Sequence, residues 1–187
     1  PDSVIVTVLP APPDIIVYPE LLTENLLSGT NSTQNLTVKN EGFCDLIFTA
    51  TPQADWLSIT SKSETIAAGD SLVLGVLIDA ANLYAGLYES EITIESNDPD
   101  EPTINIPVTL TVIGEPEIQL SQTSFDFGNV YIGQNEESNL NVANAGTDDL
   151  IVTEILSTSS DFAAAPNNFT VAPENSQDVA LTFSPSV

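Results

Sequence analysis

The feature that most constrains the fold is a stretch of sequence that occurs twice, about 104 residues apart. Residues 35–47 read NLTVKNEGFCDLI, and residues 139–151 read NLNVANAGTDDLI. A second pair of segments, residues 66–71 and 171–176, matches at a similar spacing. Each copy of the longer segment predicts a strand, a Gly-containing turn and a second strand. The chain is therefore predicted to contain repeated units of about one hundred residues each.

A third repeated segment sets the predicted domain boundaries. Residues 4–8 (VIVTV) match residues 108–112 (VTLTV). We therefore expect residues 1–10 to be the last strand of a preceding unit or a strand donated to a neighbouring copy. Residues 11–113 would then form one complete unit, and residues 114–187 a second unit that lacks its C-terminal strands. Such a chain is expected to be part of a longer tandem array.

Alternating apolar and polar residues indicate β-strands. In residues 88–95 (YESEITIE) and 104–112 (INIPVTLTV), every second side chain is apolar or small, the period of a half-buried antiparallel strand. Pro107 falls on the outward-facing positions and predicts an edge strand. Turn residues recur at intervals near ten, and no segment carries a helical apolar stripe. The predicted fold is all-β: tandem immunoglobulin-like antiparallel β-sandwiches.

Composition excludes several classes of function. The chain has 2 Lys and Arg against 27 Asp and Glu, a net charge of −25, so nucleic acid and anionic membrane surfaces are not expected partners. It has no His, which removes Ser-His-Asp and Cys-His catalysis and His-ligated zinc, and its single Cys cannot form an internal disulfide. No apolar run is long enough to span a bilayer. The sequence predicts a non-enzyme without a cofactor.

Two features are candidate binding sites. The turn that contains Asp98, Asp100 and Glu101 concentrates hard oxygen ligands of the kind that Ca²⁺ prefers, although it lacks the spacing of a calcium loop; the other interpretation is a solvated hairpin turn. Trp56 offers a face on which a sugar ring could stack, or it fills the gap between two sheets beside Leu57 and Ile59.

Other residues have predicted structural or modification roles. Tyr88, at the start of a strand, resembles a tyrosine corner, and Cys44 is either an inert small residue or one half of an intermolecular disulfide. Glycosylation sequons make Asn31, Asn35 and Asn168 candidate sites for N-linked glycans, although such triplets also arise by chance. The candidate contacts of a donated strand are Val4, Val6 and Val8.

The order of motifs resembles two known module families. Residues 13–113, with DWLSI (55–59), YAGLY (84–88) and IESNDP (94–99), resemble the BACON-like modules of bacterial extracellular proteins. Residues 114–187, with FDFGNVYIG (125–133) and ALTFSP (180–185), resemble immunoglobulin-like modules of the choice-of-anchor and abnormal-spindle/hydin type, without their closing strands. The resemblance implies spacer or interaction modules of large secreted proteins, and a carbohydrate role for the BACON-like part.

Together these observations predict a non-catalytic structural repeat. It would form a stalk, spacer or extracellular fibre of a secreted or cell-surface protein, with neighbouring repeats or copies of itself as partners, joined head to tail by strand addition. The alternative is an adhesin module that binds carbohydrate or matrix. A glycosidase carboxylate pair is possible in so acidic a chain, but sandwich loops without other polar machinery argue against it.

Overall fold

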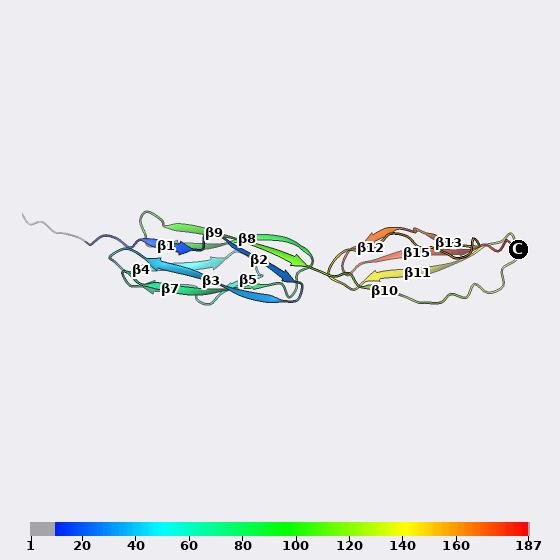
Figure 1. Ribbon diagram of the computed structural model, residues 1–187, viewed down its shortest axis with the longest axis horizontal. Helices are drawn as coiled ribbons and strands as arrows, with labels where there is room; N and C mark the ends of the chain where they lie inside the picture. Colours follow the sequence, from blue (N-terminus) through cyan, green and yellow to red (C-terminus); the bar gives the residue numbers. More distant parts are fainter. Residues whose placement is uncertain (1–9, 187) are drawn as a thin grey trace, which may run out of the picture. The chain divides into compact units, whose positions relative to one another are not determined.

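A computed structural model describes residues 10–186, and every regular element in that range is a β-strand (Figure 1). None of the described residues forms a helix with the length and hydrophobicity that a membrane span requires. The chain divides into two compact units. The first comprises the described residues up to Asn82 together with Gly86–Val112, and the second comprises Leu83–Ala85 with the described residues from Ile113 onward.

The first unit is a sandwich of two antiparallel sheets. One sheet has the strand order β1-β3-β7-β5, with β1 (Ile15–Tyr18), β3 (Asn31–Asn40), β5 (Leu57–Ile59) and β7 (Ser71–Asp79). The other has the order β2-β9-β8-β4-β6, with β2 (Leu22–Leu27), β4 (Leu46–Pro52), β6 (Ser63–Ile66), β8 (Gly86–Ser96) and β9 (Thr103–Ile113). The consecutive strands β1 and β2 thus belong to different sheets.

The alternation in the sequence places the core of this unit. Leu36 and Val38 of β3 and Val76 of β7 are fully buried, as are Ile92 and Ile94 of β8. Because successive side chains of a strand point to opposite faces, each sheet contributes every second residue to the space between them. The all-β fold and the immunoglobulin-like sandwich predicted from the sequence are confirmed.

One expectation about a strand was wrong. Pro107 predicts an edge strand, but β9 lies inside its sheet, between β2 and β8, and Pro107 stands opposite Glu91. Alternation in a sequence identifies the outward face of a strand and does not reveal how many strands flank it. Pro107 is exposed on that outward face, as its place in the pattern indicated.

The second unit has fewer described strands. One sheet has the order β10-β11-β15-β13, with β10 (Ile118–Leu120), β11 (Glu136–Asn144), β13 (Phe162–Ala165) and β15 (Ser176–Phe183). The other sheet contains β12 (Leu150–Val152) and β14 (Phe169–Val171). In chain order and pairing, β10, β11, β13 and β15 correspond to β1, β3, β5 and β7, and β12 and β14 correspond to β4 and β6. The described part of the unit has no counterpart of β8 and β9.

A buried asparagine marks the same corner of both units. Asn40, at the end of β3, is fully buried, and its Nδ2 donates to the carbonyl oxygens of Cys44 and Ile66 while its Oδ1 accepts from the N–H of Gly42. The side chain ties the turn after β3 to the strand that follows and to β6. Since every polar atom of a buried amide needs a partner, few other side chains suit this position.

Candidate functional site

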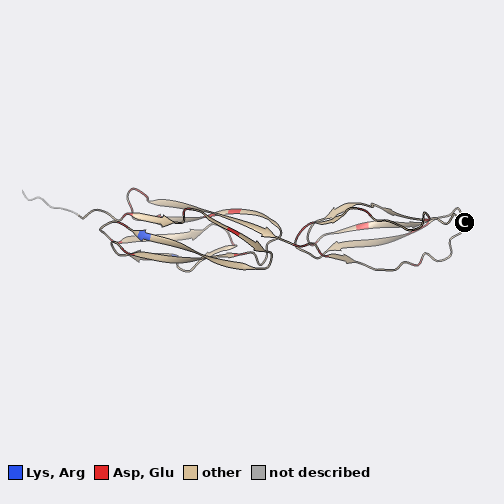
Figure 2. Ribbon diagram, in the orientation of Figure 1, with Lys and Arg blue, Asp and Glu red and all other residues tan. Residues whose placement is uncertain are grey.

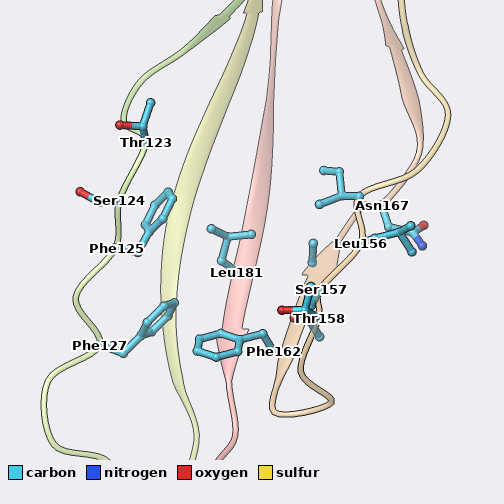
Figure 3. Close-up of a pocket in the computed structure, with 13 residues that line it drawn as sticks. Thr123, Ser124, Phe125, Phe127, Leu156, Ser157, Thr158, Phe162, Asn167 and Leu181 are labelled. Atoms are coloured by element: carbon cyan, nitrogen blue, oxygen red, sulfur yellow. The ribbon is translucent and has the colours of Figure 1, made fainter.

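A groove in the second unit is the main candidate site. It has a volume of about 630 Å³ and opens between the segment that precedes β11 and the chain that follows β12 (Figure 3). Phe125 and Phe127 line one wall, Leu156 lines the other, and Leu181 of β15 lies on the floor between them; Ile155 also lines the groove. The remaining lining residues are small or polar: Thr123, Ser124, Ser157, Thr158, Ala163, Ala164 and Asn167; Phe162 is the one further large apolar residue in the lining.

Aromatic rings gather at one end of this groove. The rings of Phe162 and Phe183 stack with their centroids 4.6 Å apart, and Phe127 lies 5.7 Å from each of them. The centroid of Phe125 is 6.5 Å from that of Phe127. Offset and tilted pairs at these separations attract each other weakly beyond their burial. The cluster gives the groove an apolar surface without charged groups.

The groove exists because this face of the sheet is uncovered. Leu181 stands at the position of β15 that Val76 occupies in β7, yet Val76 is fully buried and Leu181 is only partly buried. Phe162 stands where Leu57 is found in the first unit, and their exposed fractions are 41% and 5%. Among the described residues of the second unit, the buried hydrophobic side chains are Val142, Val171 and Val179. The second unit therefore exposes apolar surface that the first unit buries.

An acidic corner lies in the first unit. Carboxylate oxygens of Asp14, Asp98 and Glu101 lie within 4.8 Å of one another. The sequence makes Asp98, Asp100 and Glu101 candidate Ca²⁺ ligands, with a solvated hairpin turn as the other interpretation. The structure brings Asp98 and Glu101 together with Asp14, while Asp100 is not part of this group. Asp98 is buried, and Oδ2 accepts the N–H of Ile15 at 2.8 Å while Oδ1 accepts the N–H of Asp100 at 2.8 Å. Both of its oxygens therefore already serve backbone donors, and a metal ion would compete with them.

The pKa values of Asp98 and Glu101, two of the three acids in this corner, are shifted in opposite directions. Burial by itself raises the pKa of Asp98, but the backbone hydrogen bonds to its carboxylate outweigh burial, and the pKa lies below its ordinary value. Burial, together with the negative charges of Asp98, Asp100 and Asp14, raises the pKa of Glu101. In this corner Asp98 thus favours the charged form, and Glu101 holds a proton more readily. A charged Asp98 suits a structural role, because its carboxylate connects the turn between β8 and β9 to β1.

Trp56 and Tyr88 lie against each other in the first unit. Their ring centroids are 6.5 Å apart with an interplanar angle of 67°, an edge-to-face contact, and both side chains are partly buried. Part of the Trp56 surface is therefore used in packing. Stacking of a sugar on Trp56 and the tyrosine-corner role of Tyr88 stay predictions.

The predicted modification sites are accessible. Asn31 and Asn35 are exposed on β3, and Asn168 is exposed in the turn before β14. Cys44 is a free, partly buried cysteine. The strand-donor candidates Val4, Val6 and Val8 lie outside the described residues. Red acidic positions occur along both units in Figure 2, whereas both lysines, Lys39 and Lys62, belong to the first unit.

Sequence reasoning missed the residues of the groove. Phe125 and Phe127 were noted only as part of a family motif, and their role in an exposed cluster with Phe162 was not predicted. The signal was present, because the strands that would cover them were already expected to be missing. Asp14 was missed as well, since the carboxylates of Asp98 and Glu101 that lie near its own are far away in the sequence and no local pattern joins them.

Comparison with known proteins identifies the fold family. A family model described as the HYDIN/CFA65/VesB-like, Ig-like domain matches residues 24–111 and, a second time, residues 116–187. The chain belongs to this family. Each unit is thus one HYDIN/CFA65/VesB-like domain, and the hydin-type resemblance predicted for the second unit is confirmed. A chain of such Ig-like domains is a structural or binding module.

Two solved structures with a similar fold are distant in sequence. A protein of unknown function from Porphyromonas gingivalis W83 has a TM-score of 0.47 and 16% identity, over 91% of this chain and 83% of that one. PapD-like domain 7 of human CEP192 has a TM-score of 0.48 and 13% identity, over 59% of this chain and 94% of that one. At these scores the similarities do not bear on function. No curated protein matches the HYDIN/CFA65/VesB-like domains of this chain.

Proposed function

We propose that this chain is a structural repeat segment that forms a stalk, spacer or extracellular fibre of a secreted or cell-surface protein. The observation that carries the proposal is the tandem repetition of one sandwich design, down to the same buried asparagine at the same corner. Repeated domains of one kind extend a chain without adding chemistry. A net charge of −25 supports the same role, because like charges keep an extended assembly soluble.

The proposed spacer role can be tested by pulling on the chain between its termini. We expect the first unit to unfold in one cooperative event that releases about 3.5 Å of contour length per residue. The second unit, with its uncovered face, should yield at lower force. Gradual extension of the first unit without a distinct event would contradict a mechanical role.

We also propose that copies join head to tail by strand addition, with Val4, Val6 and Val8 facing the receiving sheet. Support comes from their match to Val108, Leu110 and Val112, which are buried in β9. Light scattering of the full chain should show association that deletion of residues 1–10 abolishes. Replacement of all three valines by Ser should have the same effect, whereas the matched change of Ile5 and Thr7 on the opposite face should not. Unchanged association after the deletion would overturn the strand-donor proposal.

The alternative is an adhesin module, and partial exposure of Trp56 is what favours it. The carbohydrate role that the BACON-like resemblance implies belongs to this alternative. Glycans and matrix proteins should be screened with the full chain and with Trp56→Phe, which keeps the ring packing against Tyr88. Binding that Trp56→Phe weakens would favour the adhesin over the spacer. Absence of binding across the panel would favour the spacer.

A further inference from the structure

We propose that a groove of the first unit binds a short extended segment of a basic partner protein as an added β-strand. This β1–β9 groove has a volume of about 450 Å³ and lies between β1 and the start of β9. Its lining residues are Ile15, Ile16, Val17, Glu20, Ile104, Asn105 and Ile106. The inference does not depend on the assembly of copies through residues 1–10, because it concerns a different kind of partner.

The β1–β9 groove forms where the chain passes from one sheet to the other. β1 is an edge strand of the first sheet, next to β3, and β2 is an edge strand of the second sheet, next to β9. β1 ends at Tyr18, and β2 begins at Leu22. The start of β9, at Ile104–Ile106, therefore faces β1 across the groove, and the two lie next to each other in Figure 1.

The backbone of β1 presents hydrogen-bonding groups to the groove. Glu41 N–H donates to Asp14 O beside the β1–β3 pair, and antiparallel strands exchange such bonds at every second residue. Ile15 and Val17 therefore turn their N–H and C=O groups away from β3. The N–H of Ile15 does so, since it donates to the carboxylate of Asp98. Val17 lines the groove and directs one donor and one acceptor to that side.

The start of β9 presents the same kind of groups from the other wall. Ser96 N–H donates to Pro102 O beside the β8–β9 pair, so Ile104 and Ile106 are the residues that bond β8. Asn105 turns its N–H and C=O away from β8, and it lines the groove. A strand placed in the groove thus meets main-chain donors and acceptors of both sheets, which is the requirement for strand addition.

The core beneath the groove limits the side chains of the added strand. Ile15, Val17 and Ile106 are buried, so the space between the sheets is already filled at this point. The inward side chains of the occupant must therefore be small or β-branched and uncharged, because a larger or charged group would disturb the packed core. β1 has 4 residues, so the paired segment is about 13 Å long at roughly 3.3 Å per residue.

The charges around the groove specify a basic partner. Glu20 is exposed, and it is the charged residue among the described residues that line the groove. At the other end, Asp14 immediately precedes the lining residue Ile15, and the carboxylate of Asp98 accepts the N–H of Ile15. Carboxylates at both ends attract Lys or Arg residues that flank the added strand.

The chain itself does not supply such a segment. It has two basic residues, Lys39 and Lys62, against 27 acids, and Lys39 forms an ion pair with Glu41 at 2.6 Å. Residues 1–10 include one acid and no cation. A net charge of −25 also repels a second copy. The occupant is therefore a segment of a different protein, with Lys or Arg on both sides of a short uncharged stretch.

The test uses the intact chain and the synthetic peptide KKTVTVTKK, with amide hydrogen exchange measured residue by residue by NMR. We expect the peptide to slow the exchange of the N–H groups of Val17 and Asn105 about tenfold or more. The N–H groups of Ile16 and Ile104, which pair within the sheets, should change little and serve as internal references. An increase of salt from about 0.05 M to about 0.5 M should weaken the effect, because salt screens the flanking charges.

Two control peptides separate strand pairing from general attraction by charge. KKTPTPTKK keeps the positive charge but lacks two N–H donors, and EETVTVTEE keeps the strand but reverses the charge. Neither should slow exchange at Val17 and Asn105. Protection by KKTPTPTKK would show attraction without an added strand and would overturn the inference. Equal protection by EETVTVTEE, or by a peptide of residues 1–10, would overturn the basic partner and favour an uncharged donated strand.

Matched variants of the chain locate the effect. Glu20→Gln removes the charge in the lining and should weaken protection by KKTVTVTKK several-fold. Glu89→Gln, at an exposed residue of β8, changes the net charge by the same amount and should leave protection unchanged. Equal effects of the two variants would show that the peptide responds to net charge and not to the groove, and would overturn the inference. No protection by KKTVTVTKK would overturn it too, while the pulling experiment would still judge the spacer proposal.

Discussion

The side chain of Asn144 makes the same hydrogen bonds as that of Asn40, about 104 residues earlier. Its Nδ2 donates to Asp148 O and Val171 O, as Asn40 donates to Cys44 O and Ile66 O. Its Oδ1 accepts from Gly146 and Glu117. The two asparagines are 0% and 1% exposed. A repeated buried polar corner is a stronger sign of common design than repeated apolar residues, because its geometry admits few alternatives.

Removal of this corner should destabilise each unit. Asn40→Ala leaves buried carbonyls and an N–H without partners, and we expect a loss of about 2–3 kcal/mol in the free energy of unfolding of the first unit. Asn144→Ala should destabilise the second unit in the same way. Urea denaturation measures both, and Asn105→Ser, on an exposed part of β9, is the matched control. A loss for Asn40→Ala no larger than for Asn105→Ser would show that the corner is dispensable.

Glycine is required beside each of these asparagines for a steric reason. A methyl group at Gly42 would collide with the backbone of Pro12–Asp14, and one at Gly146 with the backbone of Glu115–Glu117. We expect Gly42→Ala to lower the thermal midpoint of the first unit and Gly146→Ala that of the second, each by roughly the equivalent of 2 kcal/mol or more. Ala145→Ser, at an exposed neighbour, should change neither midpoint. If calorimetry finds the same thermal midpoint for Gly146→Ala as for the unmodified chain, residue 146 does not lie tightly against the backbone of Glu115–Glu117.

The acidic corner predicts opposite effects of pH at two residues. The folded state lowers the pKa of Asp98 from 3.8, so the stability that Asp98 contributes is present above that pH and is lost as the pH falls through the lowered value. Asp98→Asn should therefore destabilise the chain at pH 7, by about 1–3 kcal/mol, and less at pH 3. Denaturation at the two pH values measures the difference. An effect that does not change with pH would show that the charge is irrelevant.

The contribution of Glu101 to stability should depend on pH in the opposite direction to that of Asp98. The folded state raises its pKa from 4.5, so its contribution to stability is present at low pH and is lost as the pH rises through the raised value. Glu101→Gln removes repulsion by Asp98, Asp100 and Asp14, and we expect a more stable chain at pH 7 and little change at pH 3. The same denaturation series checks this. A less stable variant at pH 7 would mean that Glu101 is needed as an anion.

Much of the fold follows from local patterns, and the corrections have physical causes. The repeat around Asn40 and Asn144 and the alternation in residues 88–95 are local features, and they were sufficient to predict tandem sandwiches. The interior position of β9 depends on strands far away in sequence, so the prediction of an edge strand from Pro107 alone was wrong. The hydrogen bond from the N–H of Ile15 to the carboxylate of Asp98 joins two distant parts of the first unit, and only the folded chain reveals it.

The groove was only half predictable. Comparison of the two repeats finds no counterpart of residues 86–112 among the described residues of the second unit, so an uncovered face could be expected from the sequence. Two features of the groove depend on side-chain packing, which the periodicity of the sequence does not encode. One is its two separate walls, and the other is the cluster of Phe127, Phe162 and Phe183 at one end.

Hydrogen–deuterium exchange of the unmodified chain tests most directly the claim that both units share one design and differ in one uncovered face. We expect strong protection in β3, β7, β8 and β9 of the first unit and intermediate protection in β11 and β15. Exchange should be fast in residues 123–127 and 153–156, where the structure has no strand. Equal and strong protection in both units, including those two segments, would contradict it.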